Sequence, residues 1–271
     1  MGVKNWAGLL LVGALGAAGC GDDNDNSTAE TGGSTTPSAS TPAPTTVAAA
    51  TASTTAAANT VPETMPEADL QPGQTLFTDS FDDDRNGWGV IDDPQYGSTA
   101  FADGDHVWKF KGSVAHQLPA VLGEQYDRSE LDMRDVAVRA EVTILAGGGV
   151  IGVFCRETPD SDAEWQWYEF VARDGFAAIR HADSEGNLDV LAETGDVNLP
   201  AGEPIAIEGA CVDDANGDAQ LSMTLNGVEV LQATDNDPLG NGVPGLQAWT
   251  FPVHEQMDIR WHEFTVHQPE P

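Results

Sequence analysis

The feature that most constrains the fold of this chain is an alternation of apolar and polar residues with a period of two. In the segment 136–145, VAVRAEVTIL, Arg139, Glu141 and Thr143 would point one way, and the opposite face would carry Val136, Val138, Ala140, Val142 and Ile144. Successive side chains lie on opposite faces only in a β-strand. The segment therefore predicts a strand that buries one face against a core.

Similar runs recur along the second part of the chain, separated by turn-forming pairs such as Asp174-Gly175, Gly186-Asn187 and Asn226-Gly227. The last pair is typical of a tight hairpin turn. Besides 136–145, we expect two strands within 219–231, joined by the Asn226-Gly227 turn that leads into Val228–Leu231. Further strands are expected at 75–82, 106–118, 148–157, 164–173, 175–182, 187–193, 204–212, 244–251 and 257–267. So many short strands within residues 73–271 predict one all-β domain, an antiparallel two-sheet β-sandwich or jelly roll.

The opening of this domain resembles a known family. Phe77-Thr78-Asp79-Ser80-Phe81, followed by Gly87-Trp88, is similar to the start of bacterial concanavalin A-like (laminin-G-like) domains of the lectin–glucanase superfamily, relatives of the 3-keto-disaccharide hydrolase-like family. Further agreements are Gly152–Arg156, Tyr168-Glu169-Phe170, Asp174-Gly175, Ala210-Cys211, Leu225-Asn226-Gly227, Gly242, Gly245-Leu246, Phe264 and Val266. The resemblance implies a concanavalin A-like jelly roll. It implies little about chemistry, because such folds carry lectins, glycosidases and inert modules alike.

Residues 1–19 are organised like a secretory signal peptide. Lys4 precedes a short apolar run that is too short to span a bilayer as a helix. The run ends in Ala17-Ala18-Gly19-Cys20, which resembles the lipobox of bacterial lipoproteins, although Ala17 stands where Leu is usual. The resemblance implies cleavage before Cys20, acylation of that residue and anchoring to the bacterial membrane on its extracytoplasmic side. The alternative is a plain secretory signal followed by a stray cysteine.

Residues 20–72 are composed mostly of Thr, Ala, Ser and Pro, with almost no large apolar side chain. Such a segment cannot bury enough surface to offset the entropy of ordering, so it predicts a disordered tether between the anchor and the domain. The same composition would suit O-glycosylation.

The formal net charge is −33, and residues after 72 account for −27 of it, with 37 acidic against 10 basic side chains. A surface of that sign repels nucleic acid and polyanionic ligands. It is compatible with solubility outside the cell and with cation binding. We therefore expect no nucleic-acid partner.

With Cys20 acylated, Cys155 and Cys211 remain as an even pair in an oxidising compartment, each within a predicted strand. They favour a disulfide that closes a loop of roughly 56 residues. The alternative is two buried free thiols.

Two motifs resemble catalytic sites but depart from them. The string 130–135, ELDMRD, is similar to the E-x-D-x-x-E of laminarinase-like glycosidases, but Asp135 replaces the final Glu and the string precedes a strand. We expect an acidic loop there. His262-Glu263 and His267 approach a zinc-binding motif but are one residue too far apart, and the two histidines would lie on opposite faces of a strand.

Acidic clusters are candidate calcium sites, since calcium takes oxygen ligands. Turn loops between strands are also rich in such residues, so calcium remains only a possible cofactor. The clusters are Asp82-Asp83-Asp84, Asp103 with Asp105, and 213–218.

The candidate ligand site is the aromatic strand 164–174, EWQWYEFVARD. Alternation assigns Tyr168, Phe170 and Ala172 to the core. The opposite face would carry the candidate site residues, which are Trp165, Trp167, Glu169 and Arg173. Indole rings stack on the C–H faces of sugars, and the two charged groups would bind hydroxyls. The alternative is that loops cover the indoles.

The sequence thus favours a membrane-anchored extracytoplasmic lipoprotein with a non-catalytic domain that binds carbohydrate or another cell-envelope component. One alternative is a glycoside or keto-sugar hydrolase acting on the same face. Another is a purely structural envelope module with no small ligand.

Overall fold

The computed structural model describes residues 71–112, 115–119, 133–159, 165–183, 185, 187–250 and 256–269. Every secondary-structure element assigned in these ranges is a β-strand. No helix long and apolar enough to cross a membrane is present among the described residues. The expected signal peptide, Cys20 and nearly all of the expected tether lie outside the described residues.

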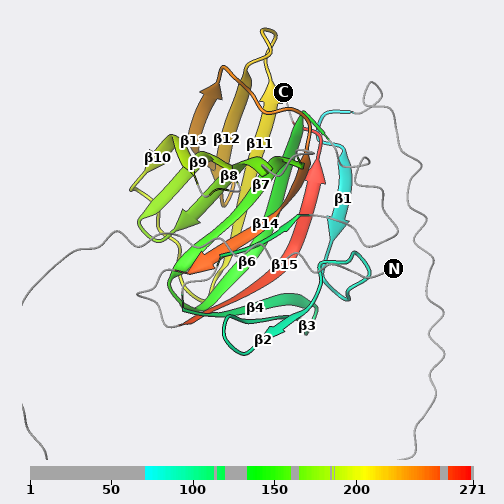
Figure 1. Cartoon of the computed structure of the whole chain (residues 1–271), viewed down its shortest axis with the longest axis vertical. Coiled ribbons are helices and arrows are strands. Elements are labelled where there is room, and N and C mark those ends of the chain that lie inside the picture. The colour runs from blue at the N-terminus through cyan, green and yellow to red at the C-terminus, as the bar shows by residue number, and fades with distance from the viewer. Residues whose placement is uncertain are drawn as a thin grey trace, which may run out of the picture. The chain divides into compact units, whose positions relative to one another are not determined.

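The strands form two antiparallel sheets that face each other (Figure 1). The larger sheet contains β1 (Thr75–Asp79), β2 (Ile91–Asp93), β3 (Gly97–Ala102), β4 (Asp105–Lys111), β6 (Val136–Gly147), β11 (Pro204–Asp213), β12 (Ala219–Leu225), β13 (Val228–Asp235) and β15 (Gln256–His267). The smaller sheet contains β5 (Ala115–Pro119), β7 (Gly149–Pro159), β8 (Trp165–Arg173), β9 (Phe176–Asp183), β10 (Leu188–Thr194) and β14 (Val243–Thr250). The prediction of an antiparallel two-sheet jelly-roll sandwich is confirmed.

The order of strands in the larger sheet is β13-β12-β11-β6-β15-β4-β3-β2, with β1 paired to β15. In the smaller sheet it is β10-β9-β8-β7-β14-β5. Strands far apart in the sequence are therefore neighbours: β14 lies between β7 and β5, and β15 lies between β6 and β4.

The apolar faces predicted by alternation form the core between the sheets. Val138, Ala140 and Val142 of β6 belong to the same buried cluster as Tyr168 and Phe170 of β8. The close approach of the sheets requires a glycine on β11, because a Cβ atom at position 209 would lie 2.1 Å from the ring of Phe170. Trp108 and Trp261 extend the core along β4 and β15, with ring centroids 5.4 Å apart.

The opening motif 77–88 is held in place by the buried carboxylate of Asp79. One of its oxygens accepts hydrogen bonds from Trp88 Nε1 at 2.6 Å and Asn86 Nδ2 at 2.7 Å, and the other accepts one from the Phe81 backbone at 2.8 Å. These bonds hold the indole of Trp88 edge-on against Phe81 and against Phe264 of β15. The motif thus buries Phe81 and Trp88 in the part of the core beside β1.

The expected single strand 106–118 is wrong. It is split into β4 in the larger sheet and β5 in the smaller sheet. Gly112, between them, has φ +66°, a left-handed conformation that interrupts a strand. The chain crosses from one sheet to the other at this break.

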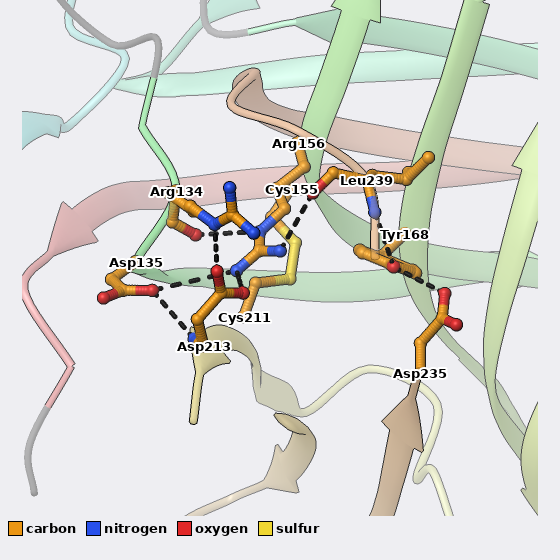
Figure 2. The surroundings of a disulfide bond; sticks show 9 residues. All are labelled: Arg134, Asp135, Cys155, Arg156, Tyr168, Cys211, Asp213, Asp235 and Leu239. Atoms are coloured by element: carbon orange, nitrogen blue, oxygen red, sulfur yellow. Dashed lines mark hydrogen bonds and ion pairs between the residues drawn. A yellow bond between two sulfur atoms is a disulfide. The ribbon is translucent and has the colours of Figure 1, made fainter. Parts of the chain in front are cut away.

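Cys155 of β7 and Cys211 of β11 form the disulfide, which confirms the predicted pairing. Because β7 and β11 belong to different sheets, the bond joins the two layers of the sandwich through the core (Figure 2). Both cysteines are fully buried.

A fully buried arginine, Arg156, follows this disulfide (Figure 2). Its guanidinium donates to the backbone carbonyls of Arg134 at 2.8 Å and Leu239 at 3.1 Å, and to the Asp213 carboxylate at 2.8 Å. A buried charge is tolerated when it is paired and hydrogen-bonded in this way. The segment that leads into β14 is thereby tied to the disulfide end of the sandwich.

Tyr168 of β8 holds the same segment from the other side. Its hydroxyl donates to the Asp235 carboxylate at 2.6 Å and accepts a bond from the Leu239 backbone N–H at 3.0 Å. Burial and the neighbouring carboxylate raise the pKa of Tyr168, so the hydroxyl keeps its proton. Arg156 and Tyr168 together position β14 relative to β7 and β8.

Candidate functional site

The two faces of β8 separate as the alternation predicts. Tyr168, Phe170 and Ala172 point into the core between the sheets. The alternate residues Trp165, Trp167, Glu169 and Arg173 occupy the outer face of the smaller sheet. There they are joined by residues of β7, β9 and β14 in register with them.

The candidate residues on this outer face differ in exposure. Trp167 is only 5% exposed and Glu169 only 3%, whereas Trp165 is half-buried and Arg173 is exposed. Trp167 packs with Phe154 of β7 and Ala182 of β9. The two indoles therefore differ in accessibility. Trp167 is buried and packs against neighbouring strands, whereas Trp165 has part of its ring exposed.

The carboxylate of Glu169 is surrounded by donors. Its Oε2 accepts a hydrogen bond from Gln247 Nε2 at 3.0 Å and a longer one from Trp167 Nε1 at 3.4 Å. Its Oε1 lies 2.5 Å from Arg180 Nη2, in a charge contact whose N–H is not aligned as a hydrogen bond. Burial raises the pKa of Glu169, although Arg180 and the hydrogen bonds oppose that shift.

Arg180 of β9 is the central cation of the cluster and is only 9% exposed. Its guanidinium carbon lies 5.0 Å from the ring centroid of Trp249 on β14, within the range of a cation–π contact. Its buried Nε has no hydrogen-bond acceptor among the residues that the structure describes. A buried N–H without an acceptor is costly, so this group is suited to an oxygen supplied by a ligand.

The side chain of Gln247 reaches Glu169 by passing over a glycine of the intervening strand β7. Gly152 of β7 lies between Val171 of β8 and Gln247 of β14 in the strand register. A Cβ atom at position 152 would lie 2.8 Å from Val171 Cγ1 and 3.2 Å from Gln247 Cγ. The glycine thus lets Gln247 reach across β7 to Glu169.

The sequence pattern predicted Trp167 and Glu169 of this cluster, but it did not predict Arg180, Gln247 or Trp249. A signal for Arg180 was present, since the predicted turn at Asp174-Gly175 forms a hairpin in which Glu169 is the register partner of Arg180. The sequence carried no corresponding signal for the two β14 residues, because β14 is paired to β7 only through the tertiary fold.

The other candidate sites have structural partners. Of the string 130–135, Glu130 to Asp132 lie outside the described residues, while Arg134 forms an ion pair with Asp213 and Asp135 lies 3.7 Å from Arg156. His262 is hydrogen-bonded to Asp105 at 2.6 Å, and His267 lies 3.9 Å from Glu208.

The acidic clusters considered for calcium cap turns and pair with arginines. Asp83 binds Arg85, which lowers the pKa of Asp83. Asp214 accepts backbone N–H bonds within its own turn, which lower its pKa as well. Across the described ranges, no three His, Cys, Asp or Glu side chains converge as a metal site would require.

No protein-family model and no curated protein matches the sequence. Among solved structures, the chain is similar to the carbohydrate-binding module CBM66 from Bacillus subtilis, with 14% identity, TM-score 0.41, and coverage of 67% of this chain and 92% of that one. It is also similar to a β-1,3-1,4-glucanase (lichenase) derived from a mouse hindgut metagenome, with 11% identity, TM-score 0.48, and 71% and 98% coverage.

A third similar structure is an endo-β-1,4-glucuronan lyase from the fungus Trichoderma reesei, with 11% identity, TM-score 0.48, and 72% and 96% coverage. At these identities and TM-scores the likenesses carry no information about what this chain binds. The strand order itself establishes the antiparallel jelly-roll sandwich.

Proposed function

We propose that the outer face of the smaller sheet binds a neutral carbohydrate without cleaving it. The observation that supports this most directly is the buried Arg180, which is charge-balanced by Glu169 and still has an Nε without an acceptor among the described residues. Half-buried Trp165 and Trp249 lie on the same face and supply ring surface. Polar groups that fix orientation beside aromatic surface are typical of small-ligand sites.

A neutral ligand fits the electrostatics better than an acidic one. The charge of Arg180 is already compensated by Glu169, and the strongly acidic chain repels polyanions. Sugar hydroxyls both donate and accept hydrogen bonds, so they match a cluster that offers the guanidinium of Arg180 and the amide of Gln247. The rings of the two tryptophans would contact sugar C–H groups.

The test is a glycan array probed with the full chain, followed by titration of the best neutral glycan. Arg180→Met and the double variant Trp165→Ala/Trp249→Ala should each weaken binding by about tenfold or more, since each removes a central contact. Arg139→Met is the matched control, because Arg139 is exposed on β6 in the larger sheet and belongs to the opposite face of the sandwich.

Three results would contradict the proposal. Unchanged affinity in both site variants would place the site elsewhere. An absence of binding by the wild type would favour a structural module. Shortened glycan products after incubation would identify a hydrolase acting on this face instead of a binding module.

We also infer that the protein is held on the extracytoplasmic side of a bacterial membrane by a lipid on Cys20. The support is the lipobox-like run before this residue. Replacement Cys20→Ser should move the chain from the membrane fraction to the soluble fraction and abolish incorporation of labelled palmitate. Retention of either property in the variant would contradict the anchor.

A further inference from the structure

A second cluster of polar side chains lies on the outer face of the larger sheet, where β4, β15 and β6 are neighbours. Asp105 of β4 lies with its Oδ1 2.6 Å from His262 Nδ1. On the other side of the same imidazole, His262 Nε2 lies 2.7 Å from Thr143 Oγ1 of β6. A carboxylate, an imidazole and an alcohol are therefore connected in series across three strands.

For a neutral His262, the order of these contacts is compatible with one direction of hydrogen bonding. An ionised carboxylate can only accept, so a neutral His262 donates its Nδ1–H to Asp105. Its Nε2 then carries a lone pair and accepts the proton of the Thr143 hydroxyl. This is the relation of base, orienting acid and nucleophile that activates an alcohol in acyl-transfer enzymes.

Arg260 completes the group. It is the register partner of Thr143 across the β15–β6 pair, so its side chain lies on the same face as that hydroxyl. Its Nη1 donates to Asp105 Oδ2 at 3.1 Å, which holds the carboxylate on its second oxygen. The Arg260 side chain is about one-third exposed, and its Nη1 also lies 3.6 Å from Asp103 Oδ2, so two carboxylates share its charge.

The surroundings allow a small molecule to approach from solvent. Thr143 is 6% exposed, but the His262 side chain beside it is 27% exposed. Leu145, two residues along β6 and thus on the same face, is 45% exposed and offers apolar surface. The position suits a compact ester whose alkyl or acyl group contacts Leu145.

We propose that Thr143 is an acyl-accepting nucleophile toward small carboxylic esters, with His262 as its base and Asp105 as the residue that orients His262. Thr143 Oγ forms a bond to the acyl carbon while His262 Nε2 takes the hydroxyl proton. The ester C–O bond breaks, and His262 passes that proton to the leaving alcohol. Water, deprotonated by His262, then attacks the acyl-threonine and releases the carboxylic acid, which restores the Thr143 hydroxyl.

This activity is independent of the proposed carbohydrate site, because the two clusters belong to different sheets. It is tested with p-nitrophenyl acetate and the full chain. The release of nitrophenolate is followed by absorbance, and acid-quenched samples are digested so that the acetyl group is located by mass spectrometry. Wild type should carry acetyl on Thr143.

Thr143→Val and His262→Gln should each slow nitrophenolate release on the order of 10²-fold, the usual contribution of a positioned general base. Thr143→Ser keeps a hydroxyl and should restore the acetylated peptide at the same position. His267→Gln is the matched control, because His267 lies on the same strand outside the cluster and tests for unspecific hydrolysis by surface imidazole. The circular dichroism spectrum and urea midpoint of each variant verify folding.

Any one of three outcomes overturns the proposal. The first is a wild-type digest with no acetyl on Thr143. The second is a folded Thr143→Val variant that reacts as fast as the wild type. The third is an equal loss of rate in His262→Gln and His267→Gln, which would show unspecific imidazole catalysis.

Discussion

Removal of the disulfide between Cys155 and Cys211 tests how much of the stability of the sandwich depends on the covalent link between its sheets. The bridged residues are 56 positions apart. The chain-entropy relation for a closed loop of that length predicts a loss of about 4 kcal/mol at 25 °C when the bridge is absent. The double variant Cys155→Ala/Cys211→Ala should show this loss plus a smaller one for the missing sulfur atoms in the core.

Urea unfolding followed by tryptophan fluorescence measures the effect. With an m-value of about 2 kcal/mol/M, typical for domains of this size, the midpoint should fall by about 2 M. Wild type that is unfolded, reduced and refolded in reductant keeps both sulfurs and should lose only the entropic part. A midpoint for the variant within about 0.5 M of the oxidised wild type would refute a stabilisation of this size.

Three further predictions follow from buried groups. Because burial raises the pKa of Glu169, the native state binds the proton of this carboxyl group more tightly than the unfolded chain does. This contribution to stability is complete below pH 4.5, the ordinary pKa of Glu169, and is lost as the pH rises through the raised pKa. The urea midpoint of the wild type should therefore fall as the pH is raised from 4.5, and that of Glu169→Gln should change less. Tyr168→Phe leaves the Asp235 carboxylate and a backbone N–H without their shared partner and should cost about 1–3 kcal/mol, measured by urea unfolding, with an unchanged midpoint as the contrary result. Gly209→Ala places a methyl group against the ring of Phe170 and should cost about 1–3 kcal/mol, seen as a lower melting temperature in differential scanning calorimetry; wild-type stability would show that the sheets are less tightly packed there.

Local patterns predicted the interior of the fold well. The alternation in β6 and β8 identified the buried faces, because a strand has a side-chain period of two wherever it lies in a protein. The cysteine pair was predicted correctly from the even count of cysteines and from the expectation of an oxidising compartment. The break between β4 and β5 was missed, because one glycine in a left-handed conformation leaves no mark on the alternation around it.

The candidate carbohydrate site was predicted only on one strand. Trp165, Trp167 and Glu169 occupy every second position of β8, so the alternation shows that they share a face. Whether they are exposed depends on the side chains that neighbouring strands place beside them, and the burial of Glu169 by Arg180 and Gln247 is a result of strand pairing. The cluster of Asp105, His262 and Thr143 also required the pairing of three strands that are widely separated in the sequence.

The sequence by itself therefore determined the class of fold, the buried faces of β6 and β8, and the aromatic and charged side chains that β8 presents on its other face. Only the tertiary structure decided which strands became neighbours, since antiparallel pairing between distant segments depends on how the whole core closes. That pairing brings Gln247, 78 residues away in the chain, to within 3.0 Å of Glu169. A functional site on a sheet is assembled across strands, whereas sequence periodicity describes one strand at a time.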